Sequence, residues 1–231
     1  MAYAPGHRDE VKRRIVQSAR RLFNRSGFDN ISVDQIMAGA GLTRGGFYSY
    51  FESKSDLYEE VLGCFFTDPE WKSCWEGVEV NLASKDVGQQ VVRAYLSRQH
   101  FEDVENSCPM VALPGDVTRS GGRAKCAFEA VFKAMVSVLE RSLVKEGRAQ
   151  TRMAGDRLPE HAIAQATAAL CVGGMVVARA MQDRELADDL RECCMAVAFE
   201  LGGWESVKSA ENGQAGRNGR ARRRSAAIAE A

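Results

Sequence analysis

The sequence has few histidines, few prolines and no excess charge of either sign. His7, His100 and His161 are the only histidines among 231 residues, and the seven cysteines form no C-x-x-C pair. Zinc sites are built mainly from His and Cys ligands at short spacings, and disulfide frameworks use an even number of cysteines. Neither is expected here. No Ser/His/Asp arrangement is evident, so we also expect no catalytic residues, no enzyme and no cofactor.

Long apolar runs are also scarce. A helix that spans a bilayer needs about 18 apolar residues, and we find no run that approaches this length. The N-terminus carries charges at Arg8, Asp9 and Glu10, where a signal peptide would have an apolar core. The sequence therefore predicts a soluble, cytoplasmic protein without a membrane partner.

Helix-forming residues are abundant. With 45% hydrophobic and 27% charged residues, the chain can bury the core of one large or two small domains. Only five prolines occur, and alternating β-branched residues are hard to find, so the predicted fold class is all-α. We expect helices near 8–26, 32–38, 43–50, 53–65, 85–101, 108–119, 128–147, 163–181 and 186–201.

The first four of these helices form a compact N-terminal module. Ser32 and Gln35 make a capping box at the start of the second helix, and a tight turn at Gly41 leads to the third. Two short helices joined in this way are typical of a helix-turn-helix, whose second helix enters the major groove of DNA. Gly45 and Gly46 each cost about 1 kcal/mol inside a helix. Their presence therefore favours close approach of the backbone to DNA.

The net charge of zero is the sum of unlike segments. Residues 1–54 carry nine basic and five acidic side chains, and residues 205–231 carry six and three. The segment between them has 16 basic against 23 acidic residues. A basic module on an acidic body is typical of a protein whose module meets a polyanion.

A dense, ordered set of residues between Arg8 and Phe66 points to one family. The set comprises Ile15, Ala19-Arg20, Leu22-Phe23, Gly27-Phe28, Ser32-Val33, Ile36, Ala40-Gly41-Leu42, the run Thr43 to Phe51, Ser53-Lys54 and Leu57. It resembles the DNA-binding domain of the TetR family of bacterial repressors and covers about a quarter of the chain.

The resemblance implies roles for individual residues. Thr43 would cap the recognition helix and bind phosphate, Arg44 would read a guanine edge, and Lys54 would bind another phosphate. Tyr48 and Ser49 would contact phosphate or a base edge. The predicted DNA-binding residues are Ser32, Val33, Thr43, Arg44, Gly45, Gly46, Tyr48, Ser49, Tyr50 and Lys54.

Three aromatic residues of this run have a structural interpretation. Phe47 and Phe51 are expected to anchor the core of the module. For Tyr50, packing between helices and contact with DNA are equally open.

The resemblance also implies a homodimer that binds palindromic double-stranded operator DNA and represses transcription. The last two expected helices fit a dimer interface, because Ala164, Ala168, Ala169, Gly173 and Gly174 would let helices pack closely. Ordinary packing inside one chain is the alternative for the same residues.

Family members bind varied small molecules between their central helices, so an effector of unknown identity is expected. Cys108 precedes Pro109 at an expected helix start, where the helix dipole favours a thiolate. This segment resembles one in a TetR subgroup that senses electrophiles, so Cys108 is either a reactive thiol or a neighbour of an apolar ligand. The candidate effector-sensing residues, which equally suit plain core, are Cys108, Phe101, Met110, Phe128, Phe132, Met135 and Met175.

The expected organisation is a helix-turn-helix domain over 8–68, with its motif at about 32–51, and a helical ligand-binding and dimerisation domain over 69–204. A basic tail over 205–231 is too polar to bury a core. Its arginines at 222–224 would either strengthen attraction to DNA or only keep the chain soluble. Other functions stay open: response to a protein partner, activation of transcription, or thiol enzymology through Cys108.

Overall fold

A computed structural model describes residues 6–64, 80–143, 152–153 and 156–204. The chain is helical across these ranges, which confirms the predicted all-α class. Within them, β structure is confined to a two-residue antiparallel pair, β1 (Arg152–Met153) with β2 (Asp156–Arg157). The expected tail over 205–231 and the expected boundary between positions 68 and 69 lie outside the described residues.

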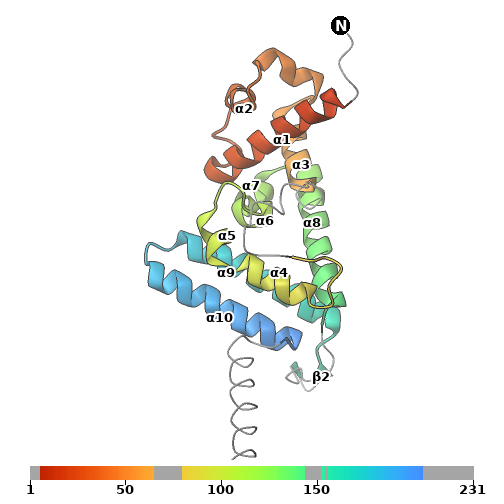
Figure 1. The fold of residues 1–231 in the computed structure, drawn as a ribbon, viewed down its shortest axis with the longest axis vertical. Helices are drawn as coiled ribbons and strands as arrows, with labels where there is room; N and C mark the ends of the chain where they lie inside the picture. Colours follow the sequence, from red (N-terminus) through yellow and green to blue (C-terminus); the bar gives the residue numbers. More distant parts are fainter. Residues whose placement is uncertain (1–5, 65–79, 144–151, 154–155, 205–231) are drawn as a thin grey trace, which may run out of the picture.

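One long helix and three short ones form the N-terminal domain, at the top of Figure 1. They are α1 (His7–Ser26), α2 (Val33–Gly39), the 3-10 helix η1 (Arg44–Ser49) and α3 (Lys54–Gly63). Signals in the local sequence set their ends. Both halves of the Ser32/Gln35 capping box are formed, and Gly41 in the following turn has a φ of 68° that suits glycine.

The C-terminal domain contains more helix breaks than the sequence predicted. Ser97 accepts a hydrogen bond from the N–H of His100 and so starts a new helix within 85–101. Pro114 lacks an N–H group and similarly divides 108–119. The helices are α4 (Val87–Tyr95), α5 (Arg98–Glu102), α6 (Pro109–Ala112), α7 (Pro114–Arg119), α8 (Gly122–Arg141), α9 (Glu160–Ala180) and α10 (Arg184–Gly202).

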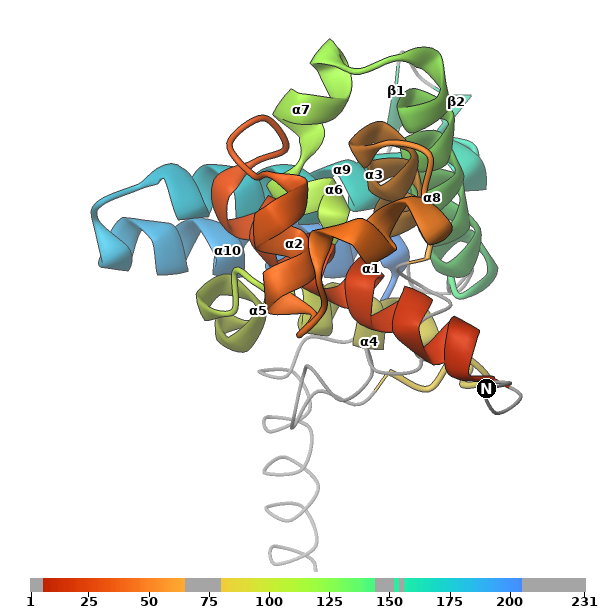
Figure 2. The same ribbon diagram turned by 90° about the horizontal axis from the view of Figure 1, so that it is seen from above.

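The helices enclose two apolar cores. One lies beneath α1 to α3, and the other lies among α4, α8, α9 and α10. The helix α8 runs down the long axis of the molecule, and α9 and α10 lie side by side at the end remote from α2 (Figures 1 and 2). Leu113, Val117 and Ala124 complete the first core from the α6–α8 segment, so packing joins the two predicted domains.

The expectation that no apolar segment reaches membrane-spanning length is wrong for α9. This helix is long and apolar enough by length and composition alone. A core helix of a soluble protein passes the same test, and 44% of the relevant window is buried inside the protein. Packing of α9 against both α8 and α10 accounts for that apolar character.

The small residues of α9 point to two sides of the helix. Ala164, Ala168 and Gly174 are buried in the chain's own core, and a Cβ on Gly174 would lie 2.8 Å from the nearest sulfur of α10. Ala169 is exposed, and a Cβ on Gly173 would meet nothing within 4 Å. The prediction of one small-residue dimer face is therefore wrong for the first three residues, which pack inside the chain.

Candidate nucleic-acid interface

The run predicted to enter DNA forms η1 and the residues beside it. Phe47 and Phe51 are buried, as predicted, and their ring centres lie 5.7 Å apart. These rings fasten the run to the core of the N-terminal domain. The other side chains of the run are left at the surface, and the exposed residues are Thr43, Arg44, Gly45, Tyr48 and Ser49.

The helix η1 has 3-10 geometry, whereas the sequence suggested an ordinary helix. Two adjacent glycines disfavour the α conformation because glycine loses the most backbone freedom when it is ordered. A 3-10 helix also has poorer hydrogen-bond geometry than an α-helix. The recognition segment is thus held in place largely by its two buried phenylalanines.

Among the described residues, no contact requires glycine at positions 45 and 46. A Cβ added to Gly45 meets nothing within 4 Å, and one added to Gly46 meets only Met37 Cε at 3.6 Å. Neither residue is among the glycines with positive φ. Contact of these two glycines with DNA stays a prediction.

Arg44 is paired with Asp34 across the two helices of the motif. Its Nη1 lies 2.9 Å from Asp34 Oδ2, and the two side chains are 64% and 56% exposed. An exposed pair contributes only about 0–1 kcal/mol. Arg44 can therefore exchange this partner for a guanine edge at small cost.

A hollow of about 340 Å³ separates η1 from the start of α1. Thr43, Ser49 and Tyr50 contribute to one wall, and His7 and Arg8 to the other. The guanidinium of Arg8 donates to the Ser49 carbonyl at 3.0 Å and lies 5.7 Å from the ring centre of Tyr50. Nothing in the local sequence marked Arg8, because only the fold brings α1 beside η1.

The predictions for Tyr50 and Thr43, which both line this hollow, have different outcomes. Tyr50 packs against the N-terminal core, which confirms its packing interpretation, while its contact with DNA stays a prediction. The Thr43 hydroxyl makes no hydrogen bond that caps η1. The expectation that the Thr43 side chain caps this helix is therefore wrong, while its contact with phosphate stays a prediction.

Lys54 serves a structural role that the sequence did not indicate. Its Nζ donates to the carbonyls of Phe28 and Ile31, both at 2.9 Å, and lies 4.2 Å from the ring centre of Phe28. These contacts fasten the connection between α1 and α2 onto α3. The predicted contact of Lys54 with phosphate stays a prediction and would compete with both carbonyls.

Ser32 and Val33 lie at the start of α2. The Ser32 hydroxyl accepts a hydrogen bond from the N–H of Gln35 at 3.2 Å, and Val33 is half-buried against the core. Their structural roles are capping and packing, and their contact with DNA stays a prediction.

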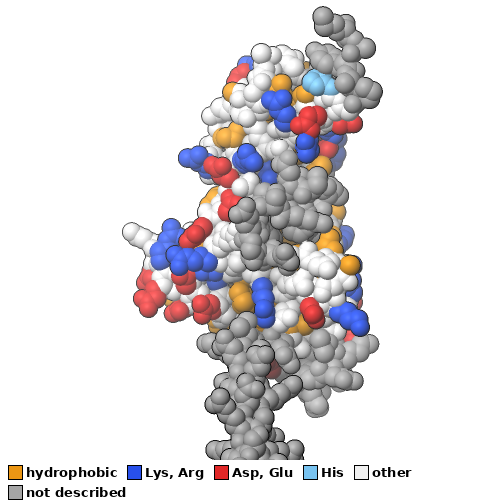
Figure 3. All heavy atoms as spheres, in the orientation of Figure 1, with side chains coloured by type: hydrophobic (Ala, Val, Ile, Leu, Met, Phe, Trp, Pro, Cys, Tyr) orange, Lys and Arg blue, Asp and Glu red, His pale blue; other side chains and the backbone are white. Residues whose placement is uncertain are grey.

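Much of the basic charge of the N-terminal segment is used inside the protein. Lys12 pairs with Glu60 at 2.8 Å, Arg14 donates to the carbonyl of Ala40, and Arg20 is buried. On the face drawn in Figure 3, Lys and Arg side chains of this domain stand beside Asp and Glu. The net basic charge of this segment therefore does not form an unbroken basic patch on that face.

The predicted effector-sensing residues gather in the C-terminal core. Phe101 belongs to this core and also lines a surface hollow. The others are buried in the core or packed against its edge, as expected for plain core residues, and their contact with a ligand stays a prediction. They are Cys108, Met110, Phe128, Phe132, Met135 and Met175.

The expectation that Cys108 forms a thiolate is wrong for this structure. The side chain is fully buried, and burial raises the pKa of its thiol to about 11. The helix that follows, α6, has only four residues, so its dipole is too small to offset desolvation. The Cys108 thiol is therefore protonated at neutral pH.

A chain of hydrogen bonds beside Cys108 connects α9 to α1. Arg179 Nη1 donates to Ser107 Oγ at 2.8 Å, and this hydroxyl lies 3.0 Å from His100 Nε2. His100 Nδ1 lies 2.7 Å from the carbonyl of Tyr95, which can only accept, so Nδ1 carries the proton and Nε2 accepts. Asn24 of α1 donates to the Ser107 carbonyl at 2.9 Å. Asn24, Ser107, His100 and Arg179 are termed the polar joint.

The two short helices and the exposed run that contains Gly45 and Gly46 define a helix-turn-helix transcriptional regulator. Residues 15–61 match the family model described as bacterial regulatory proteins, tetR family. The N-terminal domain of the chain is thus a DNA-binding domain of the TetR family of transcriptional regulators, as the resemblance indicated. The regulator AcrR of Shigella flexneri is 40% identical over 52 residues, which cover 22% of this chain and 24% of AcrR. The chain thus matches about a quarter of that relative's length.

Solved structures support the same fold over most of the chain. The reduced form of Escherichia coli NemR has a TM-score of 0.62 at 17% identity and covers 82% of this chain and 95% of its own. RolR in complex with resorcinol has a TM-score of 0.50 at 17% identity, and the match covers 90% of this chain and 95% of RolR. The relatives are regulators of transcription rather than enzymes.

Proposed function

We propose that the protein is a cytoplasmic, homodimeric repressor that binds a palindromic operator through η1 and is released by a small-molecule effector. The DNA-binding domain would span 8–68, and the ligand-binding and dimerisation domain would span 69–204. The observation that carries this proposal is the pair Gly45-Gly46, exposed at Gly45 and half-buried at Gly46, beside the exposed Arg44 and Thr43. No contact with the described residues requires glycine at either position.

The proposal is tested by selecting DNA from random duplexes with the purified protein and sequencing what is retained. Enrichment of a palindrome is expected, because two copies of the motif related by a two-fold axis read two inverted half-sites. Transcription from a promoter that carries the selected site is expected to fall when the protein is present. Retention without sequence preference would contradict the proposal, and a rise in transcription would favour an activator.

Gly45→Ala is expected to lower operator affinity about tenfold while the free energy of unfolding stays level or rises by up to about 1 kcal/mol. The new methyl group meets nothing inside the protein but would stand where the backbone approaches DNA. Fluorescence anisotropy of a labelled operator and urea denaturation measure the two quantities. Gly63→Ala is the matched control, because a Cβ there also meets nothing within 4 Å and Gly63 lies on α3. Equal operator affinities for both variants would remove Gly45 from the interface.

Arg44→Ala is expected to weaken operator binding by about 1–3 kcal/mol and to relax the base preference at one position of each half-site. The loss of the exposed pair with Asp34 should leave stability nearly unchanged. Repeating the duplex selection with the variant checks the prediction. An unchanged base preference would assign Arg44 to phosphate contact or to no contact.

Apolar stripes on the last two helices support the homodimer. Along α9 and α10, outward-facing small and apolar residues recur every three or four positions, as in helices that pack into a bundle. On α9 they are Ala166, Ala169, Gly173, Val177 and Ala180, and on α10 they are Leu186, Cys193 and Val197, with Leu190 between them partly buried against the chain's own core. A second copy would cover both stripes and form a four-helix interface.

A reversible ligand fits the structure better than an electrophile. RolR, which shares the fold, is bound to resorcinol, whereas Cys108 lacks the exposure and thiolate character of a sensor thiol. Iodoacetamide is therefore expected to label Cys108 much more slowly than the exposed Cys126. Burial hides the Cys108 sulfur and raises the pKa of its thiol to about 11, which lowers its thiolate fraction.

Mass spectrometry of the native and urea-unfolded protein measures this labelling. Equal rates for the two cysteines after unfolding would show that the native difference arises from burial. Rapid native labelling of Cys108, together with loss of the electrophile response in Cys108→Ser, would restore the covalent model.

A further inference from the structure

A hollow of about 610 Å³ opens where α5 meets the turn between α9 and α10. It is larger than the hollow beside η1 and lies in the C-terminal domain. Figure 3 shows Lys and Arg side chains gathered with Asp and Glu over this part of the molecule. The residues that line it are Arg98, Phe101, Glu102, Val104, Arg179, Arg184 and Asp188.

The charges in this hollow do not cancel. Arg98 Nε lies 2.8 Å from Glu102 Oε1, and Asp188 is paired with a buried arginine of α10. Arg179 and Arg184 are the other two basic residues that line the hollow. Within the ranges that the structure describes, neither forms an ion pair with a carboxylate. The Arg179 guanidinium donates instead to the carbonyls of His100, Phe101 and Asp103. Arg184 is therefore the exposed guanidinium of the hollow, and Arg179 is a second one that backbone carbonyls hold in place.

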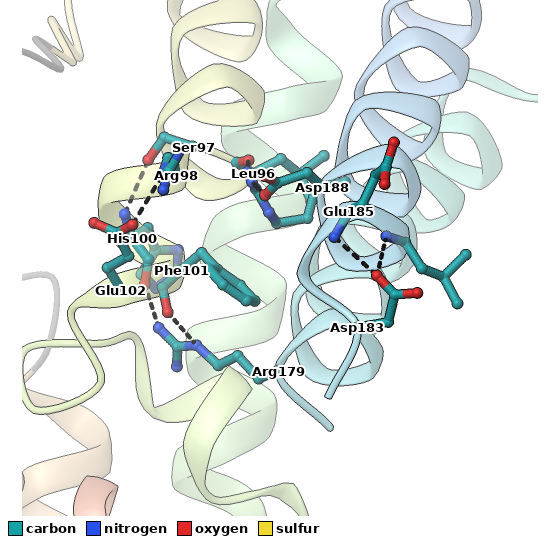
Figure 4. A network of polar contacts seen from close by, with 12 residues as sticks. Leu96, Ser97, Arg98, His100, Phe101, Glu102, Arg179, Asp183, Glu185 and Asp188 are labelled. Carbon is teal, nitrogen blue, oxygen red and sulfur yellow. Dashed lines mark hydrogen bonds and ion pairs between the residues drawn. The ribbon is translucent and has the colours of Figure 1, made fainter. Parts of the chain in front are cut away.

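An aromatic ring lies directly beside these charges. The guanidinium of Arg184 stands 5.2 Å from the ring centre of Phe101 and that of Arg191 stands 4.9 Å from it, so the ring is fixed by cation–π contacts. In Figure 4, the Arg179 guanidinium lies next to Phe101 and bonds to the end of α5. Val104, which is 39% exposed, adds apolar surface to the hollow.

We infer that this hollow binds a small organic carboxylate with an apolar body. The carboxylate would pair with the exposed Arg184, because guanidinium groups match carboxylates in charge and geometry. It would also pair with Arg179 in exchange for one of the partners that this guanidinium now holds. The apolar body would lie against Val104 and against the edge of the Phe101 ring, which is 5% exposed. The carboxylate would bind whether or not DNA is present. That its binding regulates DNA binding rests on the proposed function.

The position of Arg179 explains how such a ligand could act on DNA binding. Arg179 lines the hollow and also donates to the hydroxyl of Ser107. The backbone carbonyl of Ser107 in turn accepts a hydrogen bond from Asn24 of α1. A carboxylate that draws the guanidinium toward the hollow weakens the bond to Ser107. The change reaches α1, which carries Arg8 beside η1, so the ligand would alter how the N-terminal domain is held.

Benzoate is the probe, titrated in the millimolar range into the full-length protein without DNA and followed by calorimetry. Benzamide has nearly the same shape without the charge, and acetate has the charge without the ring. We expect benzoate to bind more tightly than either. Arg184→Gln should weaken benzoate binding about tenfold, and this side chain is exposed, so the fold should survive.

Lys125→Gln is the matched control, because it removes an equally exposed positive charge on α8, away from the hollow. The inference is overturned if benzoate fails to bind, if benzamide binds equally well, or if both variants lose the same affinity. Benzoate binding that appears only in a dissociated monomer would also overturn it, and would assign the hollow to a carboxylate of the second copy.

The operator assay separates this inference from the proposed function. Benzoate is expected to lower operator affinity in the parent protein but not in Arg184→Gln at the same concentration. No operator binding in the absence of benzoate would contradict the proposed function and leave the calorimetric result standing. Tight benzoate binding without any change in operator affinity would overturn the coupling through Arg179.

Discussion

Replacing Val177 and Val197 together by glutamate is expected to convert the protein into monomers and to lower operator affinity by about 10²- to 10⁴-fold. In the single chain these side chains are 48% and 44% exposed, so glutamate there costs the monomer little. At a two-fold interface the introduced carboxylates would face their symmetry mates and lose hydration. Each motif would then bind a half-site alone, without the high effective concentration that its partner provides.

Sedimentation velocity measures the dimer, and anisotropy measures operator binding. The matched control replaces both valines by alanine, which removes apolar volume without adding charge and is expected to retain the dimer with a smaller loss of affinity. Circular dichroism should show full helix content in both variants. A glutamate variant that stays dimeric would move the interface away from the α9 and α10 stripes.

Local signals explain why the N-terminal motif could be predicted from the sequence. The Ser32/Gln35 capping box and Gly41 act over a few residues, and the structure forms both as expected. The 3-10 geometry of η1 follows from the same glycines that marked the motif, although the sequence indicated only a helix. Structure that depends only on residues close in the sequence can be predicted before the fold is known.

Contacts between distant segments could not be predicted in this way. Lys54 finds its carbonyl partners at positions 28 and 31, and Arg8 reaches Ser49, because α1, α3 and η1 meet only in the folded domain. Cys108 shows the same limit. Its place before Pro109 suggested an activated thiol, but burial decides its pKa, and burial is a property of the whole core.

The small residues of α9 show a further limit of periodicity. A helical repeat indicates that residues share a face, but it does not say whether the face meets the same chain or another. Ala168 is buried in the core of its own chain and Gly174 lies against α10 of that chain, whereas a Cβ on Gly173 would meet nothing within 4 Å. The dimer proposal therefore rests on the outward stripe alone.

The free energy of unfolding is expected to fall by about 3 kcal/mol as the pH drops from 6.5 to 4, because of His100. The side chain is fully buried, and burial, the largest cause, lowers its pKa from 6.5 to about 4. Between these values the unfolded chain binds a proton that the folded protein excludes, so acid favours unfolding. Above pH 6.5 both forms are neutral and the effect is absent.

Urea denaturation at fixed protein concentration across this pH range measures the effect, and His100→Gln is the comparison that isolates it from carboxylates that titrate nearby. The variant should be less stable at neutral pH and should show a shallower fall toward pH 4. A parallel fall in both proteins would assign the acid sensitivity to other groups. A proton on Nε2 would also end its role as acceptor for Ser107, so the polar joint should open in the same pH window. Hydrogen exchange of the amides flanking Asn24 and Ser107 should then rise in the parent protein as the pH approaches 4, after correction for the intrinsic pH dependence of exchange.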